Sequence, residues 1–168
     1  MSLFSSLFPL YINIRILQWS CHSIHNKVNP FNCTLFAAYD ILVLQETFLY
    51  SDIYLDIPRK ILYRCERCVR PGSGLLIAVN DSLSSSHFPH FSSSSGNEIM
   101  GIQISIGSCH FNIVNVYSRS GNITYDLQAY CHSLLGPSLT LDDFNLHHFN
   151  LSILGYSCCH SCQRGFCG

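Results

Sequence analysis

The chain has 168 residues, a formal net charge of −1 and a mean hydropathy of +0.22. This length fits one domain with a sizeable core, and 48% hydrophobic against 11% charged residues argues against a disordered chain. The near-neutral charge also argues against an extended basic surface, so a nucleic-acid partner would have to be held by a local site.

The ten cysteines would form a disulfide framework only in a secreted chain. Polar residues interrupt the apolar stretch from Met1 to Leu17 and no basic residue precedes it, so the stretch does not fit a signal peptide. No apolar run approaches the length of a membrane span. We therefore expect an intracellular protein with reduced thiols and no membrane partner.

The first part of the chain predicts two strands around a short helix. Residues 10–19 combine β-branched and aromatic residues with an alternating portion, which favours a central strand. Pro30 confines the helix that follows to residues 31–38. Residues 41–44 are all apolar and run directly into Gln-Glu at 45–46, which predicts a strand buried on both faces with a carboxylate at its end.

The middle of the chain predicts further strands and a polar loop. Residues 61–65 and 75–79 read as strands, and the Pro and Gly residues within 70–74 require a turn between them. The serine-rich tract at 82–95 predicts an exposed loop or a weak edge strand.

The last part predicts a hairpin, a helix and a strand. Residues 98–106 and 110–117 alternate in polarity and are joined by Gly107-Ser108, which is typical of a β-hairpin. Residues 124–135 have the apolar spacing of a helix, and the short apolar run at 138–141 predicts a buried strand. The total of about seven strands and two helices predicts an α/β protein with two mainly antiparallel or mixed sheets packed face to face and helices outside.

Polar side chains follow three of these strands. Carboxylates at two buried strand ends, with an amide and a phenol nearby, are the groups that a Mg²⁺ site for phosphodiester cleavage uses, since oxygen ligands suit a hard cation that neutralises the phosphate. The alternative is that Asp, Asn and His only mark turns after strands. The residues concerned are Gln45 with Glu46, Asn115 with Tyr117, and Asp143 with Asn145.

Four segments in this order resemble the endonuclease/exonuclease/phosphatase family, closest to the Jockey-like endonuclease domain that begins non-LTR retrotransposon polyproteins. The resemblance covers residues 14–166, which leaves 1–13 as an N-terminal extension and 14–168 as the domain. It implies a four-layered α/β sandwich of two packed mixed β-sheets with outer helices. The segments are Gln45-Glu46-Thr47, 72–79, Val114-Asn115-Val116-Tyr117, and Asp143-Phe144-Asn145 with His147-His148, together with similar passages at 16–27 and 155–165.

The resemblance also implies a site and partners. Glu46 would bind Mg²⁺ or Mn²⁺, Tyr117 would hydrogen-bond the scissile phosphate, and Asp143 would orient or deprotonate the attacking water. Asn145 would hold the phosphate and stabilise the transition state, and Ser20 and Asn115 would be weaker contributors to phosphate binding. The implied target is DNA, cut in the nucleus, and the implied partner is a reverse transcriptase domain in the same polyprotein.

Three departures from the family pattern bear on activity. The opening Trp-Asn is Trp19-Ser20, and Asp142 replaces the usual Gly, which places a like charge beside Asp143. No Asp-His dipeptide occurs in the chain, whereas the family ends in Ser-Asp-His. We therefore expect an N-terminal fragment of such a domain, incomplete at its C-terminus and impaired or inactive as an endonuclease.

Three rival interpretations stay open. His147 and His148 could replace the missing imidazole, although neighbours on an extended chain point to opposite faces, so at most one would face the phosphate. The same fold could serve an abasic-site nuclease or another phosphoesterase. The spacing of Cys65 with Cys68, and of Cys159 with Cys162, fits a structural Zn²⁺ in a binding module.

Overall fold

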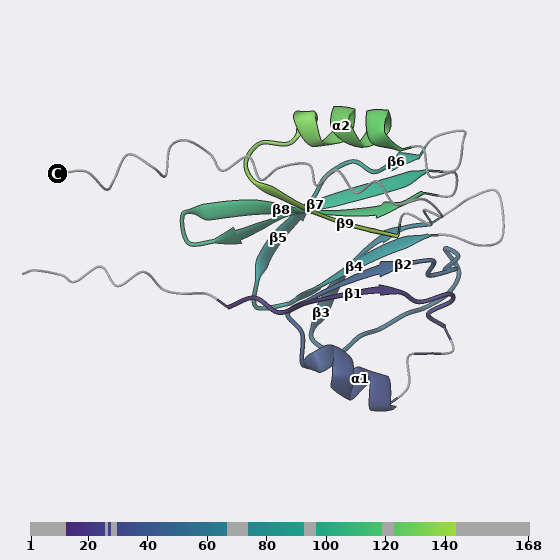
Figure 1. Cartoon of the computed structure of the whole chain (residues 1–168). Coiled ribbons are helices and arrows are strands. Elements are labelled where there is room, and N and C mark those ends of the chain that lie inside the picture. The colour runs from purple at the N-terminus through teal and green to yellow at the C-terminus, as the bar shows by residue number, and fades with distance from the viewer. Residues whose placement is uncertain are drawn as a thin grey trace, which may run out of the picture.

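The computed structural model of the protein describes residues 13–25, 27, 30–66, 74–92, 97–118 and 123–143. Within these ranges the chain forms nine strands and two helices arranged as two stacked sheets (Figure 1). None of the helices in this part of the chain is long and apolar enough to cross a membrane.

The first sheet has the strand order β1-β2-β4-β3. β1 runs parallel to β2, and the other neighbours are antiparallel, so the sheet is mixed. Helix α1 starts at Pro30, where the missing amide hydrogen is tolerated, and connects the two parallel strands. The bounds are β1 Ile16–Ser20, α1 Pro30–Ala37, β2 Ile41–Gln45, β3 Lys60–Cys65 and β4 Leu75–Asn80.

β1 departs from its prediction. It begins at Ile16 and pairs with β2 alone among the described strands, so it is an outer strand and the predicted central position is wrong. Its Gln18 and Ser20 side chains are exposed. β-Branched composition indicates a strand, but it does not determine how many neighbours the strand has.

The second sheet has the order β5-β7-β8-β9, and β6 also pairs with β7. The predicted hairpin is confirmed: Gly107-Ser108 join β7 and β8, and Gly107 has a φ of 59°. The serine-rich tract contributes the short outer strands β5 and β6, as the edge-strand alternative predicted. The bounds are β5 Ser84–His87, β6 Phe91–Ser92, β7 Glu98–Ile106, β8 Cys109–Tyr117, α2 Thr124–Ser133 and β9 Ser138–Asp143.

Three apolar clusters hold four layers together. One fills the space between the sheets, with side chains such as Val43 and Ile77 meeting Met100. A second packs Phe36 of α1 on the outer face of the first sheet, and a third packs Leu127 of α2 on the outer face of the second. The order α1, first sheet, second sheet, α2 is visible in Figure 1 and confirms the predicted α/β sandwich.

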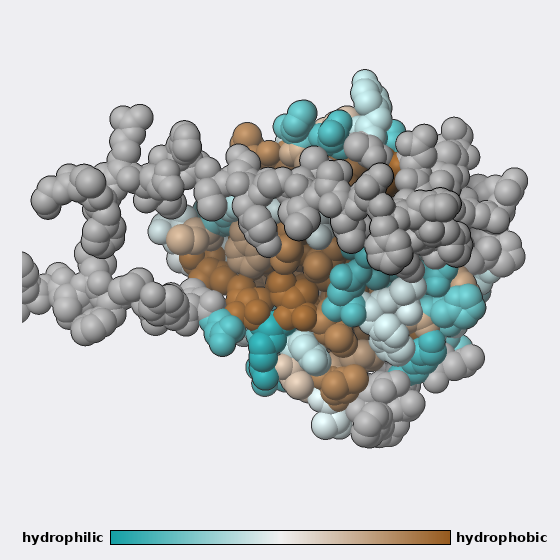
Figure 2. Space-filling view, in the orientation of Figure 1, coloured by the Kyte–Doolittle hydropathy of each residue, from teal (hydrophilic) through white to brown (hydrophobic). Residues whose placement is uncertain are grey.

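The cluster between the sheets reaches the surface along one side. β1 and β9 lie on the near side in Figure 1, and hydrophobic side chains gather between them in Figure 2. Ile16, Leu139 and Leu141 are only partly buried there. Gln18 bridges this side, because its Nε2 donates a hydrogen bond to the Asp142 carbonyl at 2.7 Å.

Candidate active site

The two sheets bring three predicted site residues to one end of the sandwich. All five residues of β2 are buried, and Glu46 follows this rigid strand directly. β1 runs parallel in a register that places Ser20 opposite Gln45, so Ser20 lies beside Glu46. Tyr117 is the last residue of β8. The predicted gathering of polar groups at strand ends is therefore observed for Glu46 and Tyr117, and Ser20, which the resemblance assigned to the site, lies beside them.

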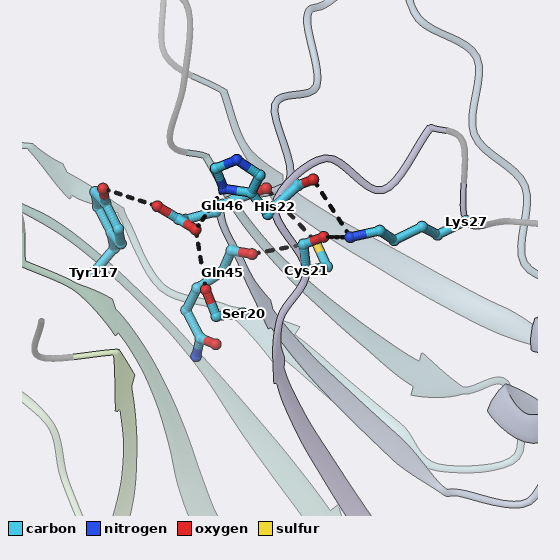
Figure 3. Close-up of polar contacts among 7 residues, drawn as sticks. All are labelled: Ser20, Cys21, His22, Lys27, Gln45, Glu46 and Tyr117. Atoms are coloured by element: carbon cyan, nitrogen blue, oxygen red, sulfur yellow. Dashed lines mark hydrogen bonds and ion pairs between the residues drawn. The ribbon is translucent and has the colours of Figure 1, made fainter.

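The Glu46 carboxylate is the centre of this group. Its side chain is 19% exposed and both oxygens have partners (Figure 3). The Tyr117 hydroxyl donates to Oε1 at 3.2 Å, while Oε2 accepts from the Ser20 hydroxyl at 3.1 Å and lies 3.2 Å from His22 Nδ1. These contacts offset part of the cost of removing the charge from water.

The backbone around Glu46 is held in rarely used conformations. Positive φ angles occur at five described residues other than glycine, and four of them lie here: His22, Ser23, Glu46 and Phe48. Each such residue costs on the order of 1–3 kcal/mol, and such strain tends to collect at functional sites. The surroundings impose it, since Ser23 N donates to the Glu46 carbonyl at 2.8 Å.

Cys21 anchors the turn that carries His22. Its amide donates to the Gln45 carbonyl at 2.9 Å, and its thiol donates to the same carbonyl at 3.2 Å. Burial raises the pKa of this thiol to about 11, so it is neutral near pH 7. The Lys27 ammonium closes the turn by contacting the Cys21 carbonyl. Cys21 is therefore an anchor rather than a nucleophile.

Gly74 supports the segment beyond Glu46. Its φ is 98°, and an added Cβ would lie 2.8 Å from Thr47 Oγ1, so only glycine fits. Thr47 N donates to the Gly74 carbonyl at 3.1 Å, and Gly74 N donates to the buried Glu98 carboxylate at 3.0 Å. Part of the predicted glycine turn thus braces the site.

Asn115 lies behind the site and is fully buried. Its Nδ2 donates to the carbonyls of Leu44 at 3.0 Å and Leu76 at 3.1 Å, and its Oδ1 accepts from Gln45 Nε2 at 2.7 Å. These bonds tie β8 to the first sheet and fix Tyr117 relative to Glu46. The predicted contribution of Asn115 to phosphate binding stays a prediction.

The end of β9 approaches the same place. β9 runs parallel to β8 with Asp143 opposite Tyr117, so its backbone reaches the site end. The structure describes the backbone of Asp143 but not its side chain. Asn145, His147 and His148 lie entirely outside the described residues. The roles predicted for Asp143 and Asn145 are therefore untested.

Sequence reasoning missed His22 as a site residue. The only available signal was its place two residues after the first strand, in Trp19-Ser20-Cys21-His22. Nothing in that pattern indicates a left-handed turn that folds the imidazole back on Glu46. Gln45 was noted only as part of a strand end, and the structure gives it a tie to Asn115.

The donors around Glu46 fit one divalent cation. The described residues contain no group of three or more His, Cys, Asp and Glu side chains that could hold a metal. Mg²⁺, however, is commonly bound through one or two carboxylates with water completing its shell. The Glu46 carboxylate, 19% exposed and beside the Ser20 hydroxyl, can serve as such a ligand. The zinc alternative is untested, because Cys68, Cys159 and Cys162 lie outside the described residues.

No family model matches the chain, and no curated protein sequence matches it. Solved structures match it in fold. The catalytic domain of human Nocturnin is 16% identical with a TM-score of 0.54 over 79% of this chain and 64% of that one. An endonuclease/exonuclease/phosphatase family protein from Leptotrichia buccalis is 13% identical with a TM-score of 0.59 over 79% and 67%.

A third match is D. rerio TDP2 complexed with a single-strand DNA product. It is 12% identical with a TM-score of 0.56, covering 80% of this chain and 62% of that one. The chain thus spans between 62% and 67% of the three solved structures. At these identities the likeness establishes the fold.

Proposed function

Because the chain has the endonuclease/exonuclease/phosphatase fold, we propose that it hydrolyses phosphodiester bonds with a divalent cation bound at Glu46. The observation that carries this proposal is the Glu46 carboxylate, held at the shared end of both sheets between the hydroxyls of Ser20 and Tyr117. A second acidic residue, Asp143, is the last residue of β9, in register opposite Tyr117.

A bound Mg²⁺ or Mn²⁺ would neutralise charge on the phosphate and favour attack by water. Glu46 would hold the ion, and the Tyr117 hydroxyl would turn from Oε1 to donate to a phosphate oxygen. Asp143 would orient the attacking water, and Asn145 would donate to the phosphate. The Ser20 hydroxyl would position the Glu46 carboxylate rather than contact the reacting atoms.

We propose that the substrate is DNA and that the chain belongs to the retrotransposon endonucleases among the proteins with this fold. Support comes from the sequence segments that are similar to that subgroup, from residues 16–27 to 155–165. A reverse transcriptase in the same polyprotein and action in the nucleus belong to this proposal. Because the net charge is −1, a broad basic face for DNA phosphates is not expected, and the chain would bind DNA mainly at the site itself.

Nicking of supercoiled plasmid tests this function. We expect slow nicking that requires Mg²⁺ and stops with a chelator, slow because the sequence has no Asp-His dipeptide to supply the family's imidazole. Tyr117→Phe removes one hydroxyl donor and should slow nicking by about 10²-fold. Nicking that proceeds equally with chelator, or that Tyr117→Phe leaves unchanged, would overturn the proposal.

A further inference from the structure

His22 has a position that the proposed roles do not use. Its side chain is 78% exposed, yet Nδ1 lies 3.2 Å from Glu46 Oε2. The Ser20 hydroxyl reaches the same oxygen at 3.1 Å, whereas Tyr117 reaches the other one. Figure 3 shows His22 and Ser20 converging on one side of the carboxylate, with Tyr117 on the other.

The imidazole is held in place by its neighbours. Its ring packs edge-on against Phe48, with centroids 5.1 Å apart and an interplanar angle of 61°. Phe48 follows Glu46 by two residues, and both have positive φ angles. Lys27 Nζ donates to the His22 carbonyl at 3.4 Å, and Ser23 N donates to the Glu46 carbonyl at 2.8 Å. The backbone segments that carry the His22 imidazole and the Glu46 carboxylate are therefore hydrogen-bonded directly to each other.

The spacing of the two donor atoms matches that of neighbouring metal ligands. Two atoms each about 2.1 Å from one ion, and at right angles to each other, lie about 3 Å apart. His22 Nδ1 and Glu46 Oε2 are 3.2 Å apart, so a turn of the exposed imidazole would let both atoms bind one ion. In the metal-free protein Nδ1 carries the hydrogen, because the carboxylate only accepts. Metal binding through Nδ1 would require the tautomer that carries its hydrogen on Nε2.

We propose that His22 is a metal ligand beside Glu46, and that its nitrogen gives the site a preference for Mn²⁺ over Mg²⁺. This inference rests on the proposed metal-binding role of Glu46. Mn²⁺ prefers oxygen ligands as Mg²⁺ does, but as a transition-metal ion it accepts an imidazole nitrogen among them more readily. Mg²⁺ favours an all-oxygen octahedron and gives up its water reluctantly. The exposure of His22 leaves room for water to complete the coordination.

Mn²⁺ binding to the chelator-treated protein tests this directly by electron paramagnetic resonance. The wild type should bind Mn²⁺ with hyperfine coupling to ¹⁴N of an imidazole, and Mg²⁺ should displace the Mn²⁺ only in excess. His22→Asn should remove the coupling and weaken Mn²⁺ binding by at least about tenfold, the lower end of the loss from changing even an outer-shell partner. Mg²⁺ binding should stay unchanged.

A matched control separates this site from other histidines. His110 is also exposed and also hydrogen-bonded through Nδ1, to Ser105 Oγ at 2.9 Å, but it lies at the start of β8, away from Glu46. His110→Asn should leave affinity and coupling unchanged. Nitrogen coupling that persists in His22→Asn would overturn the role of His22 as a ligand but would leave the proposed function standing. Metal binding that Glu46→Gln does not weaken, or no metal binding at all, would overturn the proposed function as well.

Discussion

Replacing Asn115 should destabilise the protein strongly. Asn115→Ala removes three buried hydrogen bonds, to Leu44, Leu76 and Gln45, each contributing about 0.5–1.5 kcal/mol. It also leaves the Gln45 Nε2 amide buried without its partner, which costs about 1–3 kcal/mol more. The free energy of unfolding should fall by about 3–7 kcal/mol, a large share of the 5–15 kcal/mol typical of a domain.

Urea unfolding followed by fluorescence measures this loss. Asn80→Ala is the control, because Asn80 also accepts two hydrogen bonds from Ser82 but at the surface, so we expect a cost of about 1 kcal/mol or less. The double variant Gln45→Leu with Asn115→Ala removes the stranded amide and should be more stable than Asn115→Ala alone. An Asn115→Ala variant no less stable than Asn80→Ala would refute the reasoning.

Two further predictions concern the support of the site. Gly74→Ala should lower the free energy of unfolding by about 1–3 kcal/mol more than Gly107→Ala, because only at Gly74 does the new Cβ meet an atom, Thr47 Oγ1 at 2.8 Å, in addition to a positive φ. Thermal unfolding measures both, and equal losses would contradict the clash. Burial raises the pKa of the Cys21 thiol from 9.0 to about 11, so alkylation at pH 8 should modify the exposed Cys109 and spare Cys21. The neutral thiol also contributes stability that is complete below about pH 9 and is lost as the pH rises through 11. Mass spectrometry after alkylation would contradict this if Cys21 reacted as fast as Cys109.

Local sequence patterns predicted most of the fold. Successive residues of a strand face opposite sides of the sheet, so four consecutive apolar residues before Gln45 predicted a strand covered on both faces. All five residues of β2 are buried. Gly107-Ser108 between alternating runs allows few structures other than a hairpin. The predicted helix at 124–135 ends at Ser133, because Leu134 is already extended with a ψ of 139°.

Properties that depend on distant neighbours were not predictable in this way. The outer position of β1 follows from how the sheets assemble, which its own composition does not encode. Glu46 and Tyr117 could be expected near each other because strand ends of one sandwich converge. Their hydrogen bond through Oε1 could not be predicted, because it depends on the strand register in both sheets. His22 was missed because its backbone has a φ of 45°, and nothing in the sequence around a histidine predicts such a left-handed conformation.

The proposed phosphodiester hydrolysis requires Glu46 to hold the cation. Hydrolysis of an activated diester, bis(4-nitrophenyl) phosphate, tests it most directly, since its good leaving group reduces the need for a general acid. Glu66→Gln is the matched control, because the Glu66 side chain is 23% exposed against 19% for Glu46. We predict Mg²⁺-dependent hydrolysis that Glu46→Gln lowers by at least about 10²-fold and that Glu66→Gln preserves. Equal rates for the Glu46→Gln and Glu66→Gln variants would contradict the claim.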